Sequence, residues 1–120
     1  MHEWSLATSL IEEAEAEARR RGALRVHSLT VRVGVLTGVV PELLERAYEM
    51  ARIGTFLEGA ELALDVEKAR AACPSCGGES EFEDFFLVCP ACGAIGLRPS
   101  SGEGLVLTRM ELEIPERNET

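Results

Sequence analysis

Residues 73–93 read CPSCGGESEFEDFFLVCPACG, and this stretch contains every cysteine of the chain. It carries the pattern Cys-Pro-x-Cys-Gly twice, with residues 77–88 between the two cysteine pairs. Each copy predicts a tight turn that directs two sulfurs at one point, and the glycine allows the backbone to turn back. Two such turns facing each other predict one tetrahedral metal site, with Cys73, Cys76, Cys89 and Cys92 as ligands.

The four-sulfur donor set favours structural zinc. A single iron fits the same tetrahedral geometry, so a rubredoxin-like electron carrier is an alternative, and a redox dithiol is another. An electron carrier would not need the long α/β portion of the chain that precedes the cysteines. A site that uses all four sulfurs leaves no free thiol for nucleophilic catalysis and no open position for a zinc-bound water.

The module around the cysteines spans about residues 70–98. A segment of this length cannot bury enough apolar surface to be stable alone, so metal binding is expected to supply its folding energy. Residues 79–88 are expected to form a small hairpin that joins the two cysteine pairs.

Outside the module, hydrophobic periodicity predicts a helix, strand, helix and strand before it and one strand after it. Gly22 and Pro41 mark the end of the first helix and the start of the second. The expected ranges are a helix over 4–21, a strand over 26–36, a helix over 41–53, and strands over 61–67 and 105–114.

The fold class predicted from this order is α+β. A three-stranded sheet packs with two helices, and a small zinc-ribbon-like module is inserted before the last strand. We expect two domains, an α/β domain of residues 1–69 with 99–120 and a metal-binding domain of residues 70–98.

Several side chains are expected to lie in or near the core. His27 shares a strand face with apolar residues, which indicates an edge-of-core histidine rather than a metal ligand. Trp4 is expected to anchor the first helical turn against the core, with a contact to a partner as the alternative. Met50 and Met110 also occupy core-compatible positions, and alternation places Val66 on one strand face with Leu62 and Leu64, and Val106 on one face with Met110.

The charge is strongly acidic, with 21 Asp and Glu against 12 Lys and Arg and a formal net charge of -9. Phosphate backbones repel such a chain, so nucleic-acid binding is not expected. The glutamate-rich start does not resemble a signal peptide, and no apolar run is long enough to span a membrane. We therefore expect a cytoplasmic protein whose cysteines stay reduced.

The chain begins Met1-His2-Glu3. The Met1 amine, the His2 amide nitrogen and the His2 imidazole can close fused chelate rings around one metal, and Glu3 can assist. Planar nitrogen donors suit Ni(II) or Cu(II) better than zinc. On its own the motif is a weak signal, because an exposed histidine at the second position also occurs by chance.

No catalytic machinery is evident in the sequence. It contains no phosphate-binding glycine loop, so nucleotide hydrolysis by this chain is not expected. Only two histidines are present, and no nucleophile, base and acid set can be assembled around them. We expect a protein that is not an enzyme.

The combination of MHEWSLA at the start, CPSCG and CPACG near positions 73 and 89, and VRVGVLTGVVPELLERAYEMA between them resembles the HypA family of hydrogenase maturation proteins. GTFLEGAELAL also resembles the loop and strand that follow in that family. The resemblance covers essentially the whole chain.

The resemblance implies a nickel metallochaperone. It assigns nickel to His2, with the Met1 amine and Glu3 assisting, and zinc to Cys73, Cys76, Cys89 and Cys92. It makes the α/β domain the nickel-binding domain. It also implies work with the accessory GTPase HypB on the large subunit of [NiFe]-hydrogenase, and some members contribute to urease maturation. A zinc-ribbon interaction module without a transport role is the remaining alternative.

Overall fold

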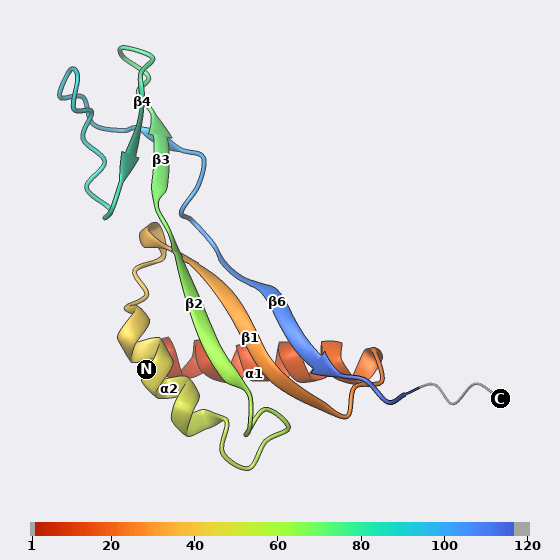
Figure 1. Ribbon diagram of the computed structural model, residues 1–120. Helices are drawn as coiled ribbons and strands as arrows, with labels where there is room; N and C mark the ends of the chain where they lie inside the picture. The colour runs from red at the N-terminus through yellow and green to blue at the C-terminus, as the bar shows by residue number, and fades with distance from the viewer. Residues whose placement is uncertain (1, 117–120) are drawn as a thin grey trace. The chain divides into compact units, whose positions relative to one another are not determined.

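The computed structural model describes residues 2–116, and its elements follow the predicted order (Figure 1). The chain forms two helices, a sheet of long strands and a small second sheet that carries the cysteine segment. The elements are α1 (His2–Arg20), β1 (Arg25–Gly34), the 3-10 helix η1 (Val35–Thr37), α2 (Pro41–Ala51), β2 (Glu61–Glu67), β3 (Ala69–Ala72), β4 (Glu79–Phe82), β5 (Arg98–Pro99) and β6 (Leu105–Glu113). The α+β fold class is confirmed.

Two sheets form, with strand orders β2-β1-β6 and β4-β3-β5. Hydrogen bonds from Leu24 N to Glu113 O (2.7 Å) and from Gly34 N to Gly104 O (2.8 Å) show that β1 and β6 run antiparallel. The crossover through α2 makes β2 parallel to β1, so the first sheet is mixed (Figure 1). The second sheet is antiparallel throughout.

By its internal contacts the chain divides into two compact units. The first comprises the chain up to Val31, Val40–Leu64 and the chain from Leu107 onward. The second comprises Arg32–Val39 and Asp65–Val106, and it contains all four cysteines.

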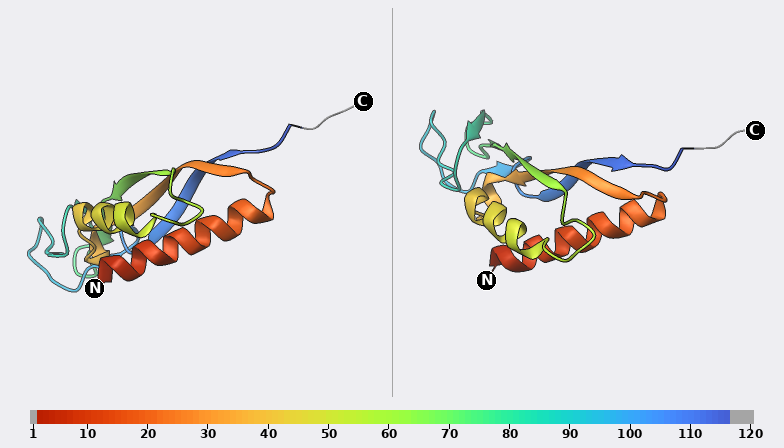
Figure 2. Two further views of the ribbon diagram at one scale, coloured as in Figure 1. Left: turned by 90° about the horizontal axis from the view of Figure 1, so that it is seen from below. Right: turned by 60° about the horizontal axis from the view of Figure 1, so that its bottom comes forward.

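In the first unit, α1 buries one aliphatic stripe and exposes its charges. The buried residues recur at three- and four-residue spacing: Ala7, Leu10, Ile11, Ala14 and Ala18. Gly22, with φ +71°, ends the helix, and Ala23 N donates to Ala18 O at 2.9 Å, which is a Schellman cap. α1 packs against α2, and both helices lie on the same side of the sheet (Figure 2).

The core of the first unit includes the only tyrosine, Tyr48 of α2, which is fully buried with Leu44. Its hydroxyl donates to Ala60 O at 2.8 Å, and Arg52 Nη1 donates to the same oxygen at 2.9 Å. Burial raises the pKa of Tyr48 to about 12, with Arg52 opposing the shift and Glu49 adding to it. The loop before β2 is thereby fixed to α2.

In the second unit, two glycines allow backbones to approach closely. Leu36 N donates to Gly102 O at 2.8 Å, and Gly102 N donates to a carboxylate oxygen of Glu67 at 2.8 Å. A Cβ on Gly34 would collide with the Gly102 carbonyl, and Gly102 itself has φ +85°. Gly34 is needed for the close approach, and Gly102 is needed for the positive φ. The two glycines therefore fix how the segment before β6 passes the end of β1.

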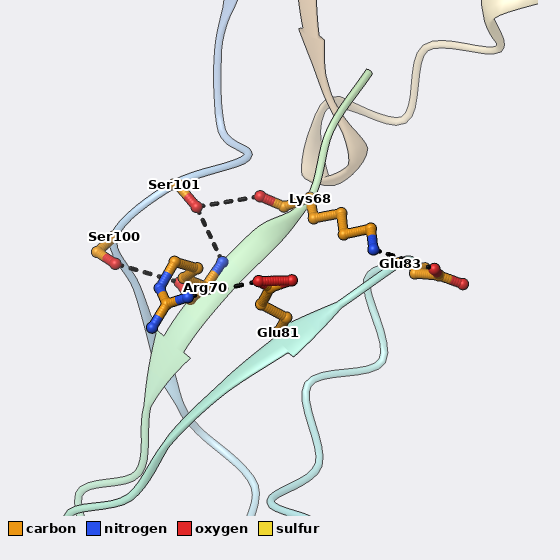
Figure 3. A network of polar contacts seen from close by, with 6 residues as sticks. All are labelled: Lys68, Arg70, Glu81, Glu83, Ser100 and Ser101. Carbon is orange, nitrogen blue, oxygen red and sulfur yellow. Dashed lines mark hydrogen bonds and ion pairs between the residues drawn. The ribbon is translucent and has the colours of Figure 1, made fainter. Parts of the chain in front are cut away.

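A polar network joins the same segment to β3 and β4 (Figure 3). The Ser101 hydroxyl donates to Lys68 O at 3.0 Å and accepts from Arg70 N at 2.9 Å. Arg70 also pairs with Glu81 across the strands at 3.4 Å, and Lys68 pairs with Glu83 at 3.6 Å. These contacts hold the segment before β6 against the start of β3.

Several burial predictions are wrong because strict alternation does not persist along the strands. Val26 and Leu29 are both buried, so the phase of β1 changes between them and His27 is left exposed, 3.1 Å from Glu113. In β6 the half-buried apolar residues are Leu105 and Leu107, then Met110 and Leu112. Val106 is exposed although Met110, predicted on the same face, is half-buried, and in β2 Val66 is exposed although Leu62 and Leu64 are half-buried.

Two predictions on the helices are wrong as well. Met50 of α2 is 66% exposed and does not belong to the core. Trp4 is 44% exposed, so it does not anchor α1 in the core. The buried residues of α2 are Leu44 and Tyr48, and Trp4 is not among the buried residues of α1.

Candidate metal centre

The four cysteine sulfurs converge on one point. The four Sγ atoms all lie within 4.8 Å of one another, and none of the four cysteines forms a disulfide. Cys73 Sγ is 3.6 Å from Cys92 Sγ, and Cys76 Sγ is 3.7 Å from Cys89 Sγ. A tetrahedral ion bound at ~2.3 Å by four sulfurs requires separations of about 3.8 Å. The donor set therefore fits a tetrahedral thiolate-bound ion.

The two cysteine turns are built alike. Gly77 N donates to Cys73 O and Gly93 N donates to Cys89 O, each at 2.8 Å. Both glycines have positive φ, +77° and +75°, in the left-handed region that other residues avoid. The turn predicted from Cys-Pro-x-Cys-Gly is thus present in both copies, and its backbone fixes each sulfur pair.

The first turn closes a hairpin, which differs from the expectation for residues 79–88. β3 ends at Ala72 and β4 begins at Glu79, and the two strands pair antiparallel with Ala72 opposite Glu79. Cys73 N donates to Gly78 O at 2.9 Å and closes the turn. Residues 79–82 therefore pair back with β3, and they do not form a hairpin with residues 83–88. The cysteine turn itself supplies the reversal.

Burial differs between the two cysteines of each turn. Cys73 and Cys89 are buried, whereas Cys76 and Cys92 are exposed. The buried pair packs with Ala71 and Leu97, and three partly buried side chains lie against this cluster: Phe82, Leu87 and Ala94. So small an apolar layer supplies little stability, which leaves a large role for a metal.

The thiols of Cys73, Cys89 and Cys92 are shifted in pKa, and not all in the same direction. Hydrogen bonds from the backbone N–H groups of Cys76 and Ser75 lower the pKa of Cys73 to about 6, although burial acts in the opposite direction. The turn amides of Cys92 and Ala91 likewise lower the pKa of Cys89. At Cys92 the Ala94 amide favours the thiolate, but bonds to the other cysteine sulfurs outweigh it and raise the pKa to about 12. The turn amides thus stabilise negative charge on the buried sulfurs, which is the state that binds metal.

The N-terminal residues are arranged differently. His2 is the first residue of α1 and is exposed, and Glu3 is half-buried. Met1 lies outside the described residues. Within residues 2–116, the four cysteines are the only group of three or more His, Cys, Asp or Glu side chains whose ligand atoms converge. The expected N-terminal site uses main-chain nitrogens in addition to the His2 imidazole.

Sequence reasoning missed a feature of α2. Leu43 and Met50 are exposed, and with Ala47 they recur at i, i+4 and i+7 beside the buried Leu44 and Tyr48. The helix therefore carries two apolar stripes, and only one of them is used by the fold. The spacing was present in the sequence, but it could not show which stripe would be covered.

The chain was compared with known proteins. The model of the HypA family, described as "Hydrogenase/urease nickel incorporation, metallochaperone, hypA", matches residues 1–112. The chain belongs to the HypA family. The predicted role as a nickel metallochaperone in hydrogenase maturation, and not as an enzyme, is thereby confirmed. The rubredoxin-like alternative receives no support.

Relatives in the HypA family extend over nearly the whole chain. Hydrogenase maturation factor HypA of Aquifex aeolicus (strain VF5) is 41% identical over 114 residues, covering 95% of this chain and 99% of its own length. Hydrogenase maturation factor HypA of Geobacter metallireducens is 42% identical over 113 residues, covering 94% and 100%. The solution structure of the Ni metallochaperone HypA from Helicobacter pylori has a TM-score of 0.68 at 23% identity, covering 94% of this chain and 98% of that one, which shows a shared fold.

The helices of this HypA-family chain give no indication of a membrane span. Among the described residues, no helix is both long and apolar enough to cross a bilayer.

Proposed function

We propose that this chain holds Ni(II) as cargo at the start of α1 and a structural zinc ion at Cys73, Cys76, Cys89 and Cys92. The observation that carries the proposal is the presence of two unlike donor sets in one chain. One consists of four converging sulfurs, and the other begins with an exposed imidazole at a helix start. Family membership supports nickel as the transported ion.

The proposed nickel site uses atoms that the helix leaves free. The first N–H groups of an α-helix have no acceptor within the helix, and α1 begins at His2. The amide nitrogens of His2 and Glu3 are therefore available to join the exposed imidazole and the Met1 amine. Planar nitrogen ligands suit Ni(II).

The same position favours release of the ion. The partial positive charge at a helix N-terminus opposes a bound cation, and the Glu3 carboxylate offsets only part of it. His2 is exposed, so a competing ligand can reach it from solvent. A delivery protein needs such a site, because tight and closed binding would prevent transfer.

The proposed zinc site has the opposite character. Four thiolates fill a tetrahedral shell and leave no position for water or substrate, so zinc there would hold the turns together and take no part in a reaction. We assign it to a zinc-binding domain of residues 70–98, and the nickel site to a domain of residues 1–69 with 99–120.

We further propose that the chain works in the cytoplasm with the accessory GTPase HypB, that it serves the large subunit of [NiFe]-hydrogenase, and that urease maturation is a second route for its nickel. The family description, which names both hydrogenase and urease, supports the two destinations.

The test measures nickel stoichiometry and affinity for the wild-type protein, His2→Ala and His27→Ala. The chain has only these two histidines, and both are exposed, so His27→Ala is a matched control. We expect His2→Ala to lose high-affinity nickel, His27→Ala to keep it, and all three proteins to keep one zinc. Unchanged nickel affinity in His2→Ala would refute the assignment.

A further inference from the structure

An open groove lies between the first turn of α1 and the outer side of α2, within the first unit. Its volume is about 420 Å³, and it is lined by Glu3, Trp4, Leu43, Arg46, Ala47 and Met50. The N-terminal end of α1 and α2 lie side by side in both views of Figure 2. The groove therefore begins directly after His2 in the sequence.

The lining of the groove is unusually apolar for a surface. Trp4 is 44% exposed, Leu43 46% and Met50 66%. The core does not use these residues, because the buried side chains of α2 are Leu44 and Tyr48, and Trp4 is not among the buried side chains of α1. Clustered large apolar side chains that the fold leaves exposed mark a binding surface more often than isolated ones do.

The rim of the groove is acidic. Glu42 and Glu49 each precede a residue of the exposed stripe by one position, so they follow its outer edge along α2, and Glu3 lies on the α1 side. Glu49 pairs with Arg52 at 2.9 Å, whereas no ion pair within residues 2–116 involves Glu3 or Glu42. Arg46 is the only cation that lines the groove. With a chain charge of -9, this rim favours a basic partner.

We propose that this groove, which we call the Trp4 groove, docks an amphipathic helix of a partner protein that places apolar side chains against Trp4 and Met50 and basic side chains along Glu3 and Glu42. A helix fits because two helices form the walls of an apolar groove, which is the setting of helix-in-groove recognition. The groove contains no sheet edge to which an extended peptide could add.

The proposal rests on the proposed function for its biological meaning. Because Trp4 follows His2 by two residues, a helix docked there would lie beside the nickel ligands and could bring a competing ligand to the ion. Docking would thus couple recognition of the partner to nickel transfer.

The test uses Trp4 as its own reporter, because it is the only tryptophan of the chain. A synthetic amphipathic helical peptide, with Leu and Phe on one face and Lys on the other, is titrated into the full chain while Trp4 fluorescence is recorded. We expect a saturable shift of the emission to the blue as the indole leaves water. A peptide with Glu in place of each Lys should bind at least about ten-fold more weakly.

Two exposed positions provide the variant and its control. Met50→Lys places a charge in the groove and should weaken binding of the Lys peptide at least about ten-fold. Leu24→Lys is matched, because Leu24 is 56% exposed in the same unit and does not line the groove. It should bind as the wild type does. Equal binding by Met50→Lys and the wild type, or by the Lys and Glu peptides, would overturn the proposal.

Two further outcomes are decisive. If Trp4 emission shifts to the blue with protein concentration alone and sedimentation shows a dimer, a second copy covers the groove and the proposal is wrong. The titration is also repeated with His2→Ala, where binding of the peptide should persist. Retained nickel in His2→Ala would refute the proposed function and leave docking intact. Undiminished peptide binding by Met50→Lys would refute docking and leave the nickel site intact.

Discussion

The four-cysteine site and the start of α1 differ in what fixes their donor atoms. At the cysteines, two turns of the same geometry hold the sulfur pairs, and hydrogen bonds such as Cys73 N to Gly78 O define each turn. At His2, the proposed nickel donors are an exposed side chain and the main-chain nitrogens of the first helical residues, which have no acceptor within the helix. The first site is part of the local fold, whereas the proposed second site is added to an element that is stable without it.

This difference indicates how much each metal can contribute to the stability of its unit. The second unit has a small apolar cluster, so an ion at its centre would replace the missing core. The first unit has a core of its own around Leu10, Leu44 and Tyr48. Loss of zinc should therefore unfold or loosen the second unit, whereas loss of nickel should leave the structure of the first unit unchanged.

Cys76→Ala should have the largest effect on this comparison. It removes one of four ligands, so the second unit should lose most of the ~10–16 kcal/mol that a structural zinc site provides. Zinc counting and amide NMR dispersion for residues 65–106 measure the result. Ser75→Ala, in the same turn and equally exposed, is the control and should keep its zinc. A folded Cys76→Ala protein with full zinc would contradict the structural role.

Leu44→Ala should destabilise the first unit and leave the sulfur site in place. Leu44 is fully buried, so its truncation should lower the free energy of unfolding by about 2–5 kcal/mol in a chemical denaturation experiment. Leu43→Ala, next to it and 46% exposed, should cost less than about 1 kcal/mol. Release of zinc by Leu44→Ala under native conditions would show that the sulfur site depends on the core of the first unit, against this prediction.

Alkaline pH should weaken the first unit through Tyr48. Its pKa is about 12 in the folded chain against about 10 when unfolded, so only the unfolded phenol ionises between these values. Stability is full below pH ~10 and falls as pH rises to ~12, by up to about 3 kcal/mol.

Tyrosinate absorbance reports this single residue. In Tyr48→Phe, where Arg52 still donates to Ala60 O, the alkaline loss of stability should disappear. Titration of Tyr48 near pH 10 in the folded protein would show that the residue is not buried as described.

His2→Ala should have the smallest effect on stability. The residue is exposed, and no hydrogen bond or ion pair of its side chain is found within residues 2–116, so the free energy of unfolding should change by less than about 0.5 kcal/mol. Thermal unfolding of metal-free protein measures this. A loss comparable to that of Leu44→Ala would mean that the start of α1 is part of the core, against the comparison drawn above.

The sequence allowed the cysteine site to be predicted more completely than the surfaces. The ligands, their turns and the positive φ of Gly77 and Gly93 depend on a few adjacent residues, so spacing and residue type determine them. The order of helices and strands also followed from periodicity. The hairpin was misplaced because the cysteine turn, rather than residues 79–88, reverses the chain.

Burial was predicted less well because it depends on distant partners. Alternation could not show that the phase of β1 changes before Leu29 and exposes His27, which then meets Glu113 from β6. Apolar spacing on α2 could not show whether Leu44 or Leu43 would be buried. The nickel ligands remain a prediction, because main-chain donors leave no distinctive side-chain pattern.

The central claim is that one polypeptide carries a closed sulfur site and an open nitrogen site that use no common ligand. Acetylation of the Met1 amine tests it most directly, with Lys68→Arg as the starting protein because Lys68 is the only lysine. Native mass spectrometry then counts both metals before and after acetylation. We predict one zinc retained and nickel lost. Undiminished nickel, or zinc lost together with nickel, would contradict the account.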